Sequence, residues 1–160
     1  NTEGRTLVVS TLISSCPFYC PIIQKQLKFL VYDKLYDRPE FKDLLFISHL
    51  VDTNGGIPDL TQFVSEQQDI NFDKWKFVTS ANDPIYDLEL PGGNLQTTDF
   101  KTSRCIGGKT YYKMILLVDR NKNVRGLYEG DQTQLIENMR KDIRKLFIEY
   151  KFCKILPIKH

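Results

Sequence analysis

The sequence predicts an α/β domain with a mostly parallel central sheet, because strand-like apolar runs alternate with amphipathic helical segments along the chain. Strands separated by helices imply parallel pairing, and a final pair of strands joined by a short polar turn adds an antiparallel hairpin. The chain has 160 residues, which is enough for one sizeable core and too few for two comfortable ones. With no internal repeat or break in composition, we expect residues 1–160 to form a single domain.

The first strand is expected over residues 6–14 (TLVVSTLIS), which are apolar on both sides of the alternation, as in a buried central strand. A helix should begin near Pro21, since proline is favoured at the first helical position. Its apolar residues recur every three or four positions as far as Leu35, and it should end near residues 37–39.

Two more buried strands are expected at residues 44–50 (LLFISHL) and 75–79 (WKFVT), with a helix between them that ends before Asn71. A short helix over residues 85–90, ended by Pro91-Gly92-Gly93, comes next. The polar residues 94–109 then read as a long loop, and loops of that length are usually functional or mobile.

Residues 114–119 and 124–128 form the clearest hairpin of the chain, and an amphipathic helix from about Gln132 closes it. One face of this helix is apolar: Leu135, Ile136, Met139, Ile143, Leu146 and Phe147. The resulting order β-α-β-α-β-α-β-β-α is the plan of a thioredoxin-like fold. In this fold helices cover both faces of the sheet and form three layers, α/β/α.

Composition excludes several classes of protein. Hydrophobic residues make up 41% and charged residues 26%, which is typical of globular proteins and not of disordered ones. With 22 basic and 20 acidic residues the net charge is +2, so there is no general attraction to nucleic acid. No apolar run approaches the roughly 20 residues that cross a bilayer. Four cysteines are too few for a scaffold held together by disulfides.

The chemistry is expected at Cys16 and Cys20, where the first strand meets the first helix. In open α/β sheets, ligands bind at the carboxyl ends of the strands. A separation of four residues brings both sulfurs to one side, and a helix N-terminus favours thiolate over thiol. Two thiolates either close reversibly to a disulfide or bind a soft metal such as Cu(I), whereas zinc would need further ligands. Two inert structural cysteines are the remaining alternative.

Four segments carry a family resemblance, and they occur in the correct order along the chain: residues 14–21 (SSCPFYCP), 46–52 (FISHLVD), 75–79 (WKFVT), and 117–119 with 124–130 (LVD and VRGLYEG). They resemble the cysteine site, second strand, W-x-F-L-T strand and closing hairpin of the Sco/SenC family. These are thioredoxin-like copper proteins associated with cytochrome c oxidase assembly. The resemblance implies that Cys16 and Cys20 bind copper, with Cu(I) favoured, and pass it to a protein partner such as an oxidase subunit.

One departure from the family pattern concerns the third copper ligand. The family uses a histidine eight residues before the aspartate of the hairpin, and the corresponding position before Asp119 is Tyr111. Tyrosine is a poor substitute, because its phenol ionises only near a pKa of about 10. Cys105 and His49 are the candidate substitutes. Cys105 would strengthen the preference for Cu(I) or act as a resolving thiol; it could equally have no role or pair with Cys153.

The alternative for His49 is a histidine packed within the strand, with no ligand role. Cys153 is expected just after the last helix and buried. The family's D-P-E-R-D-T stretch is also altered here, to residues 52–58 (DTNGGIP).

Three function hypotheses follow. The first is a Sco/SenC-like metallochaperone that binds copper and passes it on in respiratory oxidase assembly. The second, favoured by the missing histidine, is a thiol–disulfide oxidoreductase in which Cys16 attacks and Cys20 resolves. The third is an interaction domain whose site has decayed. The first two imply a protein partner, and we expect a monomer. The resemblance implies an extracytoplasmic location, periplasmic or anchored to a membrane facing the periplasm.

Overall fold

A mixed sheet forms the centre of the computed structural model, which describes residues 2–13, 19–51, 67, 69–79, 89–90, 93–94, 103–106, 109–112 and 114–155. Its strand order is β3-β2-β1-β8-β9. The parallel strands are β1 (Thr6–Ile13), β2 (Leu44–Val51) and β3 (Trp75–Thr79). An antiparallel hairpin of β8 (Met114–Val118) and β9 (Val124–Glu129) adds to β1. The predicted combination of a parallel sheet and a closing hairpin is confirmed.

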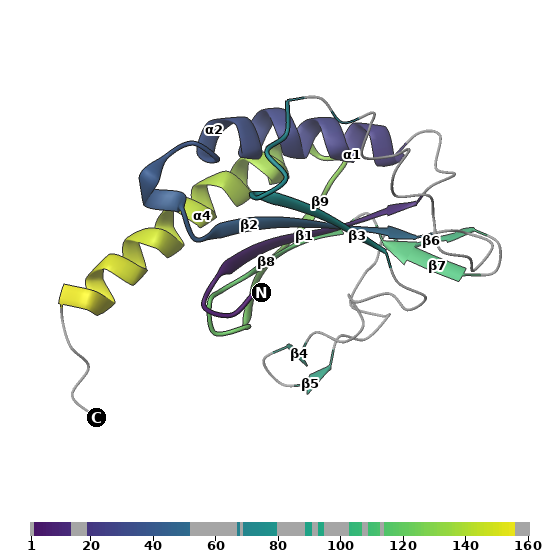
Figure 1. Cartoon of the computed structure of the whole chain (residues 1–160). Coiled ribbons are helices and arrows are strands. Elements are labelled where there is room, and N and C mark those ends of the chain that lie inside the picture. Colours follow the sequence, from purple (N-terminus) through teal and green to yellow (C-terminus); the bar gives the residue numbers. More distant parts are fainter. Residues whose placement is uncertain are drawn as a thin grey trace.

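The described helices lie together on one face of this sheet (Figure 1). They are α1 (Tyr19–Leu27), a π-helical segment (Lys28–Tyr32), α2 (Asp33–Leu35) and the long α4 (Thr133–Ile155), with a short 3₁₀ turn at Pro39–Phe41. The first three are continuous along the chain, so the helix predicted from Pro21 to Leu35 is confirmed, although it begins two residues earlier.

The π-helical segment continues α1 and is hydrogen-bonded to α4, the other long helix on this face of the sheet. A π turn takes the backbone out of the regular i to i−4 hydrogen-bond pattern. Here the guanidinium of Arg140, on α4, donates a 2.8 Å hydrogen bond to the carbonyl oxygen of Leu30. The amide side chain of Gln26 donates to the carbonyl oxygen of Gly130, just before α4, at 3.3 Å. Side chains therefore join the π-helical segment to α4 and α1 to the residues just before α4.

The period of two along each strand divides the core into two clusters. Val8, Phe46, Trp75 and Leu117 face the helices and belong to one large cluster with apolar residues of α1 and α4. The residues next to them form a second cluster on the opposite face: Leu7, Val9, Leu45, Leu116 and Val118. Both faces of the sheet are therefore apolar, as the near-continuous apolar runs predicted. The helix predicted before Asn71 lies outside the described residues.

Trp75 organises the first cluster. It is fully buried, with its ring centroid 5.2 Å from that of Tyr32, 5.3 Å from Phe46 and 5.6 Å from Phe77. The hydroxyl of Tyr32 accepts a 2.7 Å hydrogen bond from the backbone N–H of Asn71, four residues before β3. Burial raises the pKa of the Tyr32 phenol, and this hydrogen bond opposes the rise. Aromatic packing thus fixes the helical layer against β2 and β3.

The glycine of the closing hairpin motif has a steric role. A Cβ at Gly126 would lie 2.6 Å from Cζ of Tyr128, which is closer than real contacts allow. Without that Cβ the phenol lies over the glycine and donates a 2.6 Å hydrogen bond to Asp142 of α4. Gly126 therefore lets β9 dock on the closing helix.

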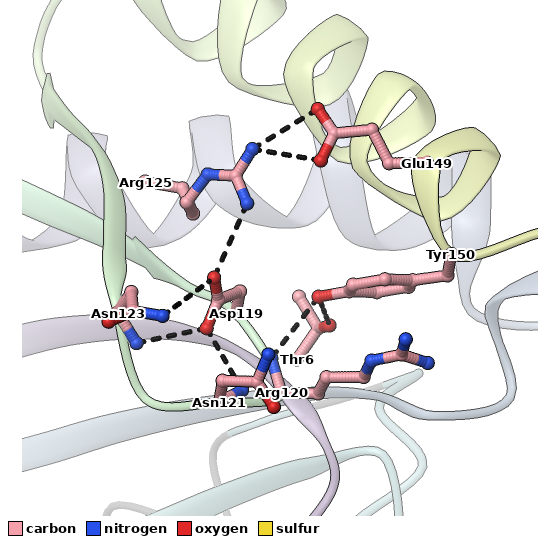
Figure 2. A network of polar contacts seen from close by, with 8 residues as sticks. All are labelled: Thr6, Asp119, Arg120, Asn121, Asn123, Arg125, Glu149 and Tyr150. Carbon is pink, nitrogen blue, oxygen red and sulfur yellow. Dashed lines mark hydrogen bonds and ion pairs between the residues drawn. The ribbon is translucent and has the colours of Figure 1, made fainter. Parts of the chain in front are cut away.

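The hairpin turn and the end of α4 share a polar network (Figure 2). The Oδ1 atom of Asp119 accepts hydrogen bonds from the backbone N–H groups of Asn121 and Asn123, both at 2.9 Å. Its Oδ2 atom accepts from the side chain of Asn123 and from Arg125, both at 3.3 Å. Arg125 also bonds both carboxylate oxygens of Glu149 on α4, at 2.9 and 3.1 Å.

Tyr150 completes this network. Its hydroxyl lies 2.8 Å from Oγ1 of Thr6 and accepts from the backbone N–H of Arg120 at 3.1 Å. The guanidinium of Arg120 stacks over the same ring, 4.2 Å from its centroid. The network therefore ties α4 both to the first residue of β1 and to the turn between β8 and β9.

Three predictions about the second half of the chain are wrong in part. Residues 89–90 were expected to end a helix, but β4 (Glu89–Leu90) pairs with β5 (Gly93–Asn94). The loop over residues 94–109 contains β6 (Ser103–Ile106), which pairs with β7 (Lys109–Tyr112). Cys153 lies within α4 and not after it. In the part of the chain that the structure describes, no helix is both long and apolar enough to cross a membrane.

Candidate cysteine site at the end of the first strand

The cysteine pair belongs to the connection between β1 and α1. β1 ends at Ile13 and α1 begins at Tyr19, so Cys20 is the second residue of the helix. Cys16 and the side chain of Cys20 lie outside the described residues, and the pairing of their sulfurs stays a prediction. The elements on either side of the connection have the predicted type and order.

This connection leaves the sheet at the edge where its parallel strands end together. Ile13 pairs with Val51, the last residue of β2, and Leu50 pairs with Thr79, the last residue of β3. The ends of three strands therefore lie side by side at the carboxyl edge, the usual location of ligand sites in open α/β sheets. The predicted cysteine site follows β1 in the chain at this edge.

The first turn of α1 carries no acidic residue. The positive end of the helix dipole and its unpaired N–H groups are therefore not offset by a carboxylate of the same turn. A helix N-terminus in general favours thiolate over thiol, which is the condition that the predicted role of Cys20 requires.

The side chains that follow Cys20 fix the helix and leave an apolar surface next to it. Ile23 is 2% exposed and belongs to the main core cluster, so it holds the first turn against the sheet. Ile22, by contrast, is 46% exposed, and Phe29 seven residues later is 56% exposed. Ile22 lies in α1 and Phe29 in the π-helical segment that continues it, so this helical stretch presents apolar side chains outward close to the predicted site.

Sequence reasoning missed a buried hydrogen-bond chain beneath this edge. The hydroxyls of Ser10 on β1 and Ser48 on β2 are 2.8 Å apart, and the indole N–H of Trp75 donates to the Ser48 hydroxyl at 2.9 Å. All three residues are buried. The signal was present in the sequence, since each of the apolar runs LVVSTLI and LLFISHL contains one serine. The chain joins the three parallel strands a few residues before they reach the cysteine edge.

His49 occupies the position of a packed strand residue. It is 1% exposed, and it pairs with Thr11 of β1 and with Val78 of β3. Its neighbours Ser48 and Leu50 share the helix-covered face of β2, so the period of two places His49 on the opposite face from α1. That position favours the packed interpretation over copper ligation beside Cys20.

Tyr111 and Cys105 lie on the small hairpin of β6 and β7. Tyr111 pairs with Arg104, and Cys105 pairs with Thr110. Directly paired residues share a face and sequence neighbours do not, so Cys105 and Tyr111 occupy opposite faces of this ladder. β7 contacts β1 and continues almost directly into β8, which brings the position of Tyr111 toward the end of β1. The two candidate positions are therefore not equivalent.

No three His, Cys, Asp or Glu side chains are grouped as metal ligands among the residues that the structure describes. Of the predicted site residues, the side chain of His49 is described, and the side chains of the four cysteines and Tyr111 lie outside the described set. The backbone places Cys20, Cys105 and Tyr111 in α1, β6 and β7, respectively.

The fold is similar to solved structures of Sco proteins. A SCO1/SenC family lipoprotein from Bacillus anthracis strain Ames superposes with a TM-score of 0.66 at 20% identity, over 91% of this chain and 83% of that one. BsSco, described as a member of the Sco family of cytochrome c oxidase assembly proteins with a disulfide switch, gives 0.64 at 18% identity, over 92% and 82%.

A third similar structure is Bradyrhizobium japonicum ScoI with copper bound, with a TM-score of 0.52 at 13% identity, over 91% of this chain and 87% of that one. No family model and no curated protein matches the sequence. The resemblance in sequence to the Sco/SenC family is therefore matched by a shared thioredoxin-like fold along nearly the whole chain.

Proposed function

We propose that this chain is a Sco/SenC-like copper-handling protein in which Cys16 and Cys20 bind Cu(I) and pass it to a protein partner during respiratory oxidase assembly. The proposal is supported by the C-x-x-x-C segment of the sequence, which follows β1 in the chain and ends in the first turn of α1, on a fold shared with Sco proteins. The copper bound in one of the similar structures supports the same chemistry.

The donor set suits copper as cargo. Two thiols give up their protons as they bind Cu(I), and the helix N-terminus lowers the cost of that deprotonation. Thiolates select the soft Cu(I) ion over Cu(II). A pair of thiolates leaves room for a third ligand, so a cysteine or histidine of the partner can enter before the first two leave. Ligand exchange of this kind transfers the ion without releasing it.

Competition between the reduced protein and a Cu(I) chelator tests the proposal. We expect one Cu(I) per chain, and Cys16→Ser and Cys20→Ser should each weaken binding by about 100-fold or more, because each removes one of two strong ligands. Cys153→Ser, which changes a cysteine of α4 far along the chain, is the matched control and should bind as the wild type does. Binding by Cys16→Ser equal to that of the control would refute a role for the pair.

The position of Tyr111 gives a second test that depends on the family resemblance. If this position replaces the family's histidine, Tyr111→His adds an imidazole and should create a site for Cu(II), with a thiolate-to-copper charge-transfer band that the wild type lacks. Cys105→His, on the opposite face of the same ladder, is the matched control and should not produce the band. A charge-transfer band in Cys105→His, and none in Tyr111→His, would assign the third ligand to position 105.

A thiol–disulfide oxidoreductase is the second candidate, favoured by the tyrosine at position 111. Disulfide exchange needs two sulfurs and no third ligand. In this mechanism the Cys16 thiolate attacks a partner disulfide, a mixed disulfide forms as the partner's second thiolate leaves, and Cys20 then displaces the partner. Cys20→Ser should trap the mixed disulfide. A reduction potential below about −300 mV would indicate an inert structural bridge instead.

Both candidates require a protein partner to reach the cysteine edge, and the exposed Ile22 of α1 and Phe29 of the π-helical segment offer it an apolar surface. Both also agree with an extracytoplasmic location, which the lipoprotein among the similar structures supports. Fractionation of cells that express the full-length protein, with accessibility to an external protease as the readout, tests that location.

A further inference from the structure

The outward face of α4 carries two apolar side chains among cations. Ile148 is 52% exposed and Phe152 is 59% exposed, although residues of these types are usually buried. They are four residues apart and so lie on one face of the helix. Four exposed basic residues share this face: Lys141, Arg144, Lys145 and Lys151. We refer to these six residues as the basic–apolar stripe.

The stripe lies opposite the core-facing side of α4. With 3.6 residues per turn, Ile148 and Phe152 fall near its centre, and the cations flank them within about 120° of arc. The core-facing residues Ile143 and Phe147 point the other way into the main cluster. Helices of globular domains normally place their apolar residues on one face, so a second apolar centre surrounded by cations needs its own explanation.

Few acidic groups offset this charge. Glu149 is bound by Arg125 at 2.9 Å, on the side of α4 that faces the hairpin turn. Asp142 lies 3.9 Å from Lys145, in an exposed pair that contributes little. The stripe therefore keeps a net positive charge.

A cavity of about 260 Å³ opens beside the stripe. Arg38, Arg144 and Lys151 supply cations to its lining, and Phe41, Phe147 and Ile148 supply apolar side chains. Glu40 also lines it and lies 4.0 Å from Arg38, with both side chains exposed. Cations beside an apolar surface match an amphiphile that has an anionic head and a hydrocarbon tail.

We propose that the basic–apolar stripe docks this domain on the surface of an anionic phospholipid membrane. Ile148 and Phe152 would enter the boundary between headgroups and acyl chains, and the surrounding cations would lie at the level of the phosphates. The apolar centre of the stripe favours lipid over nucleic acid or a purely acidic partner, since burying both side chains in an apolar phase is favourable and neither of those partners offers one.

The stripe also lies at a favourable place in the fold. A second cavity, of about 190 Å³, adjoins the first and is lined by Thr6, Tyr150 and Lys151, so this end of α4 lies beside the start of β1. The cysteine connection leaves from the other end of β1. Docking through the stripe would leave that edge accessible to a protein partner, but the proposal rests on the residues of α4 and not on copper binding.

Vesicle co-sedimentation of the full chain tests the proposal. We expect binding to phosphatidylcholine vesicles that contain phosphatidylglycerol, little binding to phosphatidylcholine alone, and release by high salt. Ile148→Ser/Phe152→Ser and Arg144→Glu/Lys145→Glu should each lower the partition coefficient about tenfold or more. Lys25→Glu/Lys76→Glu makes the same change in net charge elsewhere, and Leu135→Ser removes another exposed apolar side chain of α4. Both controls should bind nearly as the wild type does.

Three outcomes would overturn the proposal. Wild-type protein that does not bind anionic vesicles at low salt removes it directly. An equal loss in the stripe variants and the controls would mean that net charge alone drives binding. A concentration-dependent dimer in sedimentation velocity that Ile148→Ser/Phe152→Ser abolishes, without vesicle binding by the wild type, would assign the stripe to a second copy of this chain. Far-ultraviolet circular dichroism and thermal midpoints establish that each variant is folded.

Discussion

At the scale of single residues, the Ser48 hydroxyl is the polar group on which the centre of the core depends most. It accepts the indole N–H of Trp75 at 2.9 Å and bonds Ser10 at 2.8 Å, all within buried surroundings. Removing an acceptor while its buried donor remains costs the full desolvation of that donor. We expect Ser48→Ala to lower the free energy of unfolding by about 2 kcal/mol.

Ser10→Ala is the matched comparison, because it leaves the Ser48 oxygen in place to accept from Trp75. We expect it to cost about 1 kcal/mol, roughly half as much. Urea denaturation followed by fluorescence measures both variants, since Trp75 is the single tryptophan of the chain and reports on its own environment. If Ser10→Ala lowers the free energy of unfolding more than Ser48→Ala does, the hydrogen bond from Trp75 to Ser48 contributes less than expected.

Buried phenols make the stability sensitive to alkaline pH. Burial raises the pKa of Tyr128 above its ordinary value of about 10, and the hydrogen bond to Asp142 and the charge of that carboxylate raise it further. Burial also raises the pKa of Tyr32. Above about pH 10 the unfolded chain releases these protons while the folded chain keeps them, so the free energy of unfolding falls as pH rises.

We therefore expect the urea midpoint of the wild type to fall from about pH 10 upward. Below that pH both phenols are protonated in the folded and unfolded chain, so they add no pH dependence. Tyr128→Phe, which has no phenol proton at that position, should start from a lower stability and lose less of it over the same interval. The difference between the two slopes is the readout, because it cancels the lysines that titrate in the same range. Parallel slopes would contradict the assignment to Tyr128.

At the scale of elements, the turn between β8 and β9 depends on the two oxygens of one carboxylate. Asp119 is 4% exposed; its Oδ1 holds two backbone N–H groups and its Oδ2 holds Asn123 and Arg125. We expect Asp119→Ala to destabilise by about 3 kcal/mol, since it leaves all these donors without their acceptor. Asp119→Asn keeps one carbonyl oxygen for the two backbone groups and should cost less than half as much.

Glu149→Gln is the control for the rest of this network. The pair of Arg125 and Glu149 is substantially exposed, and exposed pairs contribute little, so the expected cost is below about 1 kcal/mol. Thermal midpoints and urea denaturation of the three variants establish the order. A cost for Glu149→Gln equal to that of Asp119→Ala would mean that the tie to α4, and not the turn, carries the stability.

The elements also differ in how far the sequence predicted them. β1, β2 and β3 were identified to within a residue because Val, Ile and Leu dominate runs bounded by turn residues. Residues 89–90 were assigned to a helix because Pro91-Gly92 ends helices well. The same pair suits the turn of a hairpin, and the pairing of Leu90 with Gly93 leaves just those two residues between the strands.

The small hairpin of β6 and β7 was missed for a related reason. Its sequence, around Arg104 and Thr110, is too polar for a period of two to stand out, and its two strands form a separate small sheet. The same limit applies to the candidate site. Cys16 and Cys20 could be proposed from the sequence because they are close together in it. The opposite ladder faces of Cys105 and Tyr111 follow only from the register of that hairpin.

At the scale of the whole molecule, the polar network around Tyr150 and the proposed cysteine site belong to opposite ends of β1. Thr6, at its start, is bonded to Tyr150 of α4, whereas the cysteine connection follows Ile13 at its end. Seven residue steps of a strand span roughly 23 Å. Over such a distance, changes without shared contacts act independently of each other.

Tyr150→Phe therefore tests whether the two ends of β1 act independently. It removes the hydroxyl that bonds Thr6 and the backbone of Arg120, but keeps the ring beneath the Arg120 guanidinium and against Phe147. We expect a loss of about 1–2 kcal/mol, seen as a thermal midpoint lower by roughly 2–8 °C. The rate at which reduced cysteines react with an alkylating reagent should stay within about twofold of the wild type. A larger change in that rate at a temperature where both proteins are folded would show that the network around Tyr150 reaches the cysteine edge through the sheet.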